Sequence, residues 1–300
     1  MVRRVNGRIG SGCTTLQGTN NDVSPDLLAL QSEFLTVLLD FDRLCQRLGL
    51  RYTLAGGTLL GAMRHHGFIP WDDDLDVNMP RADYEKLRAF LSTSEVDHLV
   101  LLDETTWPDY PMVFAKLVTT RPSRFFCNPS TGIPSRFTKP FVDIFPLDET
   151  AAKVPWGLAT RIQVAKRALA LKNRGVTNGP RRPGWHKLLI KEGPVLAMAL
   201  LVSWIVPGRT LHRDFDRWST SQNGRGRDYL VGFGGAYSLS REIMPKTVHG
   251  DPVMVDFEQH LMPVPQHAGV ILQSLYGDWL QLPPPSERYP VHMPKVVPLR

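Results

Sequence analysis

Four aspartates lie close together in the segment WDDDLD. Carboxylates this dense repel one another unless a cation or another positive group lies between them. An apolar, strand-forming stretch follows at 75–79, so we expect the cluster to belong to folded structure rather than to a solvated acidic turn. Hard oxygen ligands at this spacing favour Mg²⁺ or Mn²⁺, with water and a phosphate filling the remaining positions. The residues concerned are Asp72, Asp73, Asp74 and Asp76.

The alternation of an extended chain separates these four carboxylates. Residues two apart share a face, so Asp72, Asp74 and Asp76 point one way and Asp73 points the other. This geometry makes Asp74 and Asp76 the principal metal ligands, with Asp72 as a contributor.

A further carboxylate stands alone in the apolar segment FVDIFPLD, residues 141–148. A charge inside such a strand is costly without a partner, and two interpretations of Asp143 stay open. It is either half of a buried ion pair with an arginine or lysine, or a third metal ligand on a strand beside the first. Asp148, which follows a proline in the same segment, is predicted to be a turn or cap residue.

Gly56, Gly57 and Thr58 precede the acidic segment and are predicted to bind phosphate. Glycines let backbone amides approach a ligand closely, and the start of the following helix offers free N–H groups and a positive dipole end. Thr58 adds a hydroxyl. A phosphate-binding turn that faces a metal-binding strand is the arrangement that phosphoryl transfer requires.

The elements that must position these residues follow from caps and periodicity. Ser24 and Pro25 predict the start of a long amphipathic helix, and Gly49 predicts its end. Strands are predicted at 51–55, 75–79, 99–102, 112–117 and 141–148, and helices at 58–65, 81–91, 156–171, 185–206, 210–219 and 267–275. The proline-rich tail at 276–292 is predicted to wrap over the surface without regular structure.

These elements predict an α+β fold whose mixed sheet is flanked by helices. We expect a disordered tail at 1–23, a catalytic core at 24–150, and a helical and C-terminal segment at 151–300 that completes the same domain. A loop rich in glycine, proline and arginine at 173–184 is the best internal boundary.

Composition limits the classes of function. The chain has 300 residues, of which 42% are hydrophobic and 21% charged, as in soluble globular proteins. Its net charge of +6 favours anionic partners such as nucleotides, phosphorylated glycans or an acidic membrane surface. No motif of interleaved basic and aromatic residues accompanies that charge, so nucleic acid is not an expected partner. Three scattered cysteines and no apolar core in the first 23 residues predict a cytoplasmic protein without disulfides or a secretory signal.

The segment PVLAMALLVSWIV, residues 194–206, raises the question of a membrane. As a helix it would span about 20 Å, less than the ~30 Å hydrocarbon core of a bilayer. A buried core helix, a helix that lies on a membrane surface and a true span stay open as interpretations. The basic residues that precede it are compatible with a peripheral position at the inner face of the membrane.

The run GGTLLGAMRHHGFIPWDDDLDVNMPRADYEKL, which begins at residue 56, resembles the signature of the LicD family. This family includes bacterial phosphocholine transferases and, more distantly, fukutin-related proteins. Two further segments match in order: FVDIFPLD at 141–148, and YGDWLQLPP at 276–284 with Arg288 and His292 after it. The resemblance extends from about Arg51 to His292.

The resemblance implies a nucleotidyltransferase-like core with a helical insertion. Gly57 and Thr58 fall on its phosphate-side turn, and Asp143 falls on its third carboxylate. The resemblance also makes Arg64 a candidate for binding phosphate charge, with a surface arginine as the alternative. The catalytic and metal-binding set that it implies is Asp74, Asp76 and Asp143, with Asp72 as a further ligand.

The implied reaction transfers a phospho-alcohol from a CDP-alcohol such as CDP-choline, with Mg²⁺, to a hydroxyl of a cell-surface glycan. Such glycans include lipopolysaccharide, teichoic acid and capsule, and CMP leaves. Asp143 could orient the acceptor hydroxyl and take its proton. The quaternary ammonium of choline would suit an aromatic cage. Candidates are Trp71, Tyr84, Tyr276 and Trp279, and Asp278 belongs to the same C-terminal motif as the last two.

Two other functions stay open. A true nucleotidyltransferase, which moves a nucleoside monophosphate onto a small molecule or glycan, would use the same glycines and carboxylates. A glycan- or membrane-binding protein with a degenerate site is the non-enzymatic alternative, and the presence of all three carboxylates argues against it.

Overall fold

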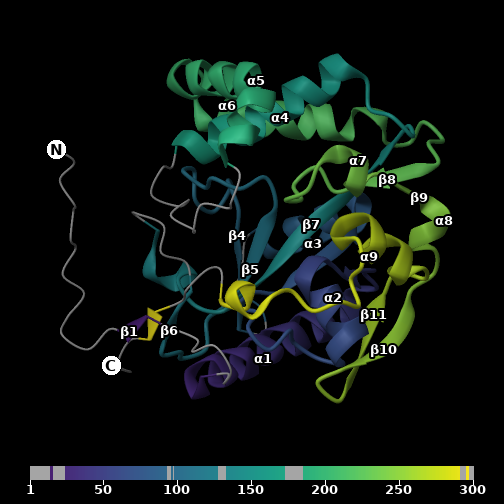
Figure 1. Cartoon of the computed structure of the whole chain (residues 1–300). Coiled ribbons are helices and arrows are strands. Elements are labelled where there is room, and N and C mark those ends of the chain that lie inside the picture. The colour runs from purple at the N-terminus through teal and green to yellow at the C-terminus, as the bar shows by residue number, and fades with distance from the viewer. Residues whose placement is uncertain are drawn as a thin grey trace.

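The computed structural model describes residues 14–15, 24–92, 96, 98–127, 133–172, 185–290 and 295–296, with side chains of α5 described from residue 193. The predicted boundary loop at 173–184 and the predicted tail at 1–23, apart from Thr14–Thr15, lie outside these residues. Figure 1 shows a central sheet with α1 along one side of it and α4, α5 and α6 gathered at one end.

Among the described residues, a sheet of seven strands forms the centre of the molecule. Its main path runs in the order β2 (Thr53–Leu54), β3 (Asp76–Pro80), β7 (Phe141–Thr150), β5 (Ala115–Thr119), β4 (Leu99–Leu102). The β3–β7 pair is parallel and the other neighbours are antiparallel. The far end of β7 pairs with β8 (Tyr229–Val231), which pairs in turn with β9 (Met244–Pro245). The predicted α+β fold with a mixed sheet is confirmed.

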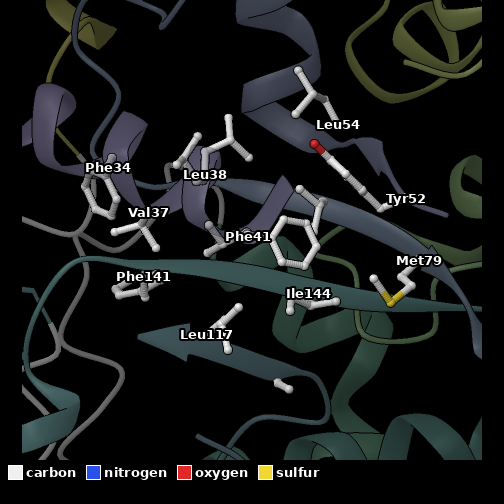
Figure 2. Close-up of a cluster of buried hydrophobic side chains, with 14 of the residues drawn as sticks. Phe34, Val37, Leu38, Phe41, Tyr52, Leu54, Met79, Leu117, Phe141 and Ile144 are labelled. Atoms are coloured by element: carbon white, nitrogen blue, oxygen red, sulfur yellow. The ribbon is translucent and has the colours of Figure 1, made fainter. Parts of the chain in front are cut away.

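Helix α1 (Pro25–Leu48) covers one face of this sheet. The Ser24 hydroxyl accepts a hydrogen bond from the amide of Leu27 at 3.1 Å, and Gly49 ends the helix with a left-handed φ of 62°. Both predicted caps are therefore confirmed. Figure 2 shows how the apolar face of α1 meets the sheet: Phe34, Val37, Leu38 and Phe41 face Leu117, Phe141 and Ile144.

The remaining elements surround the sheet. The other helices are α2 (Gly56–His65), α3 (Arg81–Leu91), α4 (Trp156–Lys172), α5 (Trp185–Ile205), α6 (Gly208–Ser219), α7 (Leu239–Glu242), α8 (Lys246–His249) and α9 (Ala268–Tyr276). Strands β10 (Val253–Phe257) and β11 (His260–Val264) form a hairpin, and β1 (Thr14–Thr15), β12 (Lys295–Val296) and β6 (Phe125–Phe126) form a small separate sheet. Short 3₁₀ turns lie at Ser135–Phe137, Thr220–Gln222 and Pro285–Glu287.

The helices α4, α5 and α6 have a hydrophobic core of their own. Ile162 and Leu169 of α4 pack with Leu211 and Phe215 of α6, and Val231 of β8 completes this core. Within the described part of the chain, no helix is both long and apolar enough to cross a membrane. The cysteines described there, Cys45 and Cys127, are buried and free.

Three predicted details differ from the structure. The helix predicted from Thr58 begins at Gly56, because the glycine pair forms its first turn rather than a preceding loop. The strand predicted at 112–117 lies at Ala115–Thr119, where it pairs with β4 and β7. The prediction that Asp148 is a turn or cap residue is wrong. It lies within β7, and its buried carboxylate accepts two hydrogen bonds from the guanidinium of Arg81, at 2.8 and 2.7 Å.

Candidate active site

Three charged side chains form a row across the sheet. Asp76 lies directly opposite Asp143 in the parallel β3–β7 pair. Asp143 lies directly opposite Lys116 in the antiparallel β7–β5 pair. Residues in direct register share a face, so the three side chains project from the same side of the sheet. Two carboxylates 67 positions apart in the sequence thus become neighbours, as predicted for Asp76 and Asp143.

Lys116 is the charge partner of Asp143. Its Nζ donates to both carboxylate oxygens, at 2.6 and 2.8 Å, and both side chains are buried. The same Nζ lies 3.6 Å from the centre of the Phe141 ring, which adds a cation–π contact. Of the two interpretations of Asp143, the structure therefore shows the buried ion pair. A role of Asp143 as a metal ligand stays a prediction, and it requires Lys116 to share or release that carboxylate.

The start of α2 lies against the acidic segment. A Cβ placed on Gly56 would collide with the Asp76 carboxylate, and one on Gly57 would lie 2.7 Å from an Asp72 oxygen. Gly56 also has a left-handed φ of 51°, which favours glycine. Only residues without side chains let the helix start approach both carboxylates this closely. The positive end of the helix dipole stabilises negative charge at that place.

Buried hydrogen bonds fix the acidic segment relative to α1 and α2. The Thr58 hydroxyl, predicted to contact phosphate, accepts a hydrogen bond from the amide of Asp76 at 2.8 Å and is buried. In this structure it positions the strand. Gln31 of α1 donates to the carbonyls of Ile69 and Asp72, at 3.2 and 3.0 Å.

The predicted alternation of the aspartates agrees with their burial. Asp73 is buried, whereas Asp72, Asp74 and Asp76 are partly exposed. Strand β3 itself begins only at Asp76, so Asp72 and Asp74 lie in the extended segment before it.

A cavity of about 690 Å³ opens beside this segment, between α2 and the chain that follows α9. It brings together the predicted substrate-binding residues of the first and last motifs, which are far apart in the sequence. Its lining includes Arg64, Trp71, Tyr276, Asp278, Trp279 and Arg288. Tyr84, the fourth candidate for an aromatic cage, is not part of it: that ring is buried on α3 between the guanidinium groups of Arg81 and Arg88.

Arg64 fastens the C-terminal segment to α2. Its guanidinium donates to the carbonyl of Trp279 at 2.9 Å and to that of Gln281 at 3.4 Å. Burial lowers the pKa of Arg64, with Arg288 acting in the same direction. Within its described residues 277–290, the predicted tail wraps over the surface with one 3₁₀ turn, and it also forms one wall of the cavity.

Tyr276 connects the cavity with the acidic segment. Burial raises the pKa of its phenol well above the ordinary value, and the nearby Tyr237, Asp76 and Asp72 raise it further. Trp71 in the cavity lining directly precedes Asp72, so the cavity lies next to the acidic segment. Arg288 lies over the Trp71 ring, 5.6 Å from its centre, so a cation already contacts an aromatic face there.

The donor set suits a hard divalent cation, although the described residues hold no group of three His, Cys, Asp or Glu side chains gathered as a metal site. Asp76 and Asp72 both supply carboxylate oxygens beside the start of α2. Both oxygens of Asp143 contact Lys116 instead. The residues thus fit a cation held by few protein ligands and completed by phosphate oxygens, which is common for Mg²⁺.

Comparison with known proteins finds a family that matches the stretch containing most of these residues. Residues 49–168 match the LicD/FKTN/FKRP nucleotidyltransferase domain, a stretch that contains α2, the acidic segment, Lys116 and Asp143. The predicted resemblance to the LicD family is confirmed over this stretch of 120 residues, and it supports a transferase of the LicD type.

Individual relatives cover different parts of the chain. This chain is 28% identical over 264 residues to the lipopolysaccharide cholinephosphotransferase LicD of Haemophilus influenzae. That match covers 86% of this chain and 93% of that protein. The chain is 48% identical over 52 residues to the ribitol 5-phosphate transferase FKRP of mouse and human, across 16% of this chain and 10% of those proteins.

Proposed function

We propose that this protein transfers a phospho-alcohol, with phosphocholine as the first candidate, from a CDP-alcohol to a hydroxyl of a cell-surface glycan and releases CMP. The observation that carries the proposal is the row of Asp76, Asp143 and Lys116 beside the start of α2, with a cavity of about 690 Å³ next to it. Such a site can hold a diphosphate at one end and its organic substituent at the other.

The donor diphosphate would bind between the start of α2 and the acidic segment. Backbone amides of the first turn of α2 would donate to phosphate oxygens, since Gly56 and Gly57 allow close approach. Asp76 and Asp72 would hold Mg²⁺ or Mn²⁺, with Asp74 joining them when the cation binds, and the cation would supply positive charge to the diphosphate and to the departing CMP. Lys116 would add a positive charge near the reacting phosphate.

Asp143 is the proposed proton acceptor. It lies beside Asp76, so an acceptor hydroxyl near the reacting phosphate would be within its reach. As the hydroxyl oxygen bonds to phosphorus, its proton passes to Asp143 while the bond from phosphorus to CMP breaks. The Lys116 ammonium donates to both oxygens of Asp143 and would stabilise the carboxylate form that a base requires.

The cavity lining suits a zwitterion. Arg64 and Arg288 bring positive charge, Asp278 and Glu287 bring negative charge, and three aromatic rings accompany them. Phosphocholine carries both charges, and its quaternary ammonium binds aromatic faces. The relative that is matched over 93% of its length is named a lipopolysaccharide cholinephosphotransferase. That name supports choline over ribitol as the transferred alcohol. A glycolipid acceptor of that kind would place the protein at the inner face of a membrane.

A nucleotidyltransferase activity is the second candidate, because the matched domain carries that description. The same site would then transfer the CMP moiety and release the other part of the donor. The identity of the leaving product distinguishes the two reactions.

The test is a panel of CDP-choline, CDP-ribitol and CDP-glycerol, incubated with the protein and Mg²⁺, with and without lipopolysaccharide. We expect CMP release that is fastest with CDP-choline and rises with acceptor. Asp76→Asn should abolish this release, while Asp256→Asn, at a carboxylate in the β10–β11 hairpin, should retain it. A folded protein that releases no CMP from any donor would contradict the proposal.

A further inference from the structure

We propose that the α4–α6 unit docks on an anionic lipid surface through the exposed apolar face of α5. The proposal stands on the structure of that unit and does not depend on the proposed function. A glycolipid acceptor would, however, be met at such a surface.

The apolar face of α5 consists of large side chains on one stripe of the helix. Met198, Leu201, Trp204 and Ile205 follow one another at helical spacing and are 49%, 62%, 83% and 69% exposed. The opposite side of the helix, with Ala199 and Ser203, is buried. Helix α5 is therefore apolar on the side that packs in the protein and on the side that faces out. A contiguous exposed apolar face of this kind marks an interaction surface.

The α4–α6 unit carries two exposed tryptophans. Trp204 lies near the end of α5, and Trp156, the first residue of α4, is 84% exposed. Tryptophan has a large apolar ring with one N–H group, and it is enriched where hydrocarbon meets the headgroups of a bilayer. In a water-soluble unit such rings would normally be buried.

The charge of the same unit identifies the kind of surface. Residues 151–222 contain 13 lysines and arginines and 3 aspartates and glutamates, a net charge of +10, whereas the whole chain carries +6. The rest of the chain is therefore net acidic, at −4. Exposed cations in the described part of this unit are Lys153, Arg161, Lys172, Arg209, Arg213 and Arg217. Anionic headgroups attract such a basic, apolar unit and do not attract the acidic remainder.

A second copy of the chain is a poorer occupant of this face. Pairing two α5 faces would bring together two units of +10, and like charges across an interface disfavour association. A transmembrane position does not fit either, because no helix in the described residues can span a bilayer. The geometry fits a helix that lies in the plane of the surface.

The test is flotation of the full chain with vesicles of phosphatidylcholine, alone or mixed with phosphatidylglycerol. We expect binding to the mixed vesicles only, and weaker binding as salt is added. The double variant Leu201→Ser, Trp204→Ser should bind at least about tenfold more weakly, because it removes two apolar groups from the interface. The control Leu261→Ser, at a residue of β11 that is 66% exposed, should bind like the wild type.

A second pair of variants tests the charge. Arg161→Gln and Arg217→Gln should each weaken binding to the mixed vesicles about fivefold, while Arg47→Gln on α1 should not. The proposal is overturned if the wild type ignores mixed vesicles, or if the serine variants bind as well as the control. It is also overturned if light scattering shows a dimer that these variants dissociate.

The outcome is separable from that of the proposed function. None of these substitutions lies near the carboxylates or the cavity, so CMP release from CDP-choline without vesicles should be the same as in the wild type. Vesicle binding without CMP release would contradict the proposed function alone. CMP release without vesicle binding would contradict the docking proposal alone.

Discussion

At the scale of single residues, the pairing of Lys116 with Asp143 decides how the site can work. Both groups are buried and lie at hydrogen-bond distance, so each is the main compensation for burying the other. Burying such a pair costs desolvation free energy, and removing one partner leaves the other as an uncompensated buried charge. The position of the pair beside Asp76, on the face that approaches α2, suggests that it serves the reaction rather than stability alone.

The substitution Lys116→Met tests this residue. It keeps the length of the side chain but leaves the carboxylate of Asp143 buried without its cation, so the pKa of Asp143 should rise. We expect the pH profile of CMP release to shift its acidic limb to higher pH, with a loss of stability of about 3–5 kcal/mol. Lys166→Met is the control, because that partly buried lysine of α4 contacts the carbonyls of Phe233 and Gly235 rather than a carboxylate of the row. Profiles that coincide for Lys116→Met and the wild type would exclude a role of Lys116 in tuning Asp143.

The glycine pair gives a second residue-scale prediction. Gly57→Ala places a methyl group 2.7 Å from an Asp72 oxygen and should lower CMP release strongly, through displacement of the acidic segment. Gly157→Ala in α4, where a Cβ meets nothing within 4 Å, should leave the rate unchanged. Kinetics of the two variants, with thermal unfolding as a check of folding, measure the difference. Equal rates would show that the close approach of α2 has no part in catalysis.

At the scale of elements, an ion pair holds α3 to the end of β7. The guanidinium of Arg81 binds both oxygens of Asp148, which also accepts a hydrogen bond from Asn223 at 2.8 Å. Arg81 is the first residue of α3, directly after β3, so this contact fixes the end of the parallel pair that carries Asp76 and Asp143.

Breaking this ion pair should therefore destabilise the core. Arg81→Met leaves a carboxylate buried without its charge partner and should lower the free energy of unfolding by about 3–5 kcal/mol. Arg124→Met breaks an exposed pair with Asp26 and should cost at most about 1 kcal/mol. Denaturant unfolding compares the two. Equal losses would mean that the buried pair adds no more than an exposed one.

Elements that carry local signals could be predicted from the sequence. The caps of α1 and the start of α3 at Pro80–Arg81 depend on neighbouring residues, and so does the alternation from Asp72 to Asp76. Lys116 was missed, although a signal existed. A lone lysine in the apolar strand AKLVT matches the lone aspartate in FVDIF, and only strand pairing shows that the two meet.

The cavity could be anticipated only in part. The family motifs pointed to Trp71, Tyr276 and Asp278, but nothing local predicts that the chain after α9 folds back over α2. That contact joins residues more than two hundred positions apart, through Arg64 and the carbonyl of Trp279. Arg288 over Trp71 follows from the same contact and had no local signal as a cavity residue.

At the scale of the whole molecule, chemistry and charge lie in different parts of the chain. The carboxylates and the cavity belong to the sheet and the segments around it, whereas the excess of basic residues belongs to 151–222. The net negative charge of the catalytic part does not attract a phosphate substrate. Binding of that substrate would therefore depend on local positive groups, namely the start of α2, Lys116 and a bound cation. The basic unit, at one end of the sheet in Figure 1, is free to serve another partner.

The central claim is that the phosphate next to the alcohol moves to the acceptor. The most direct measurement uses CDP-choline labelled with ³²P on the choline-bearing phosphate and with ³H in cytidine, together with lipopolysaccharide and Mg²⁺. The account predicts ³²P on the lipopolysaccharide and ³H in free CMP, with neither transfer nor release in Asp76→Asn. Tritium on the acceptor, or no transfer by a folded wild-type protein from this or any other CDP-alcohol, would contradict it.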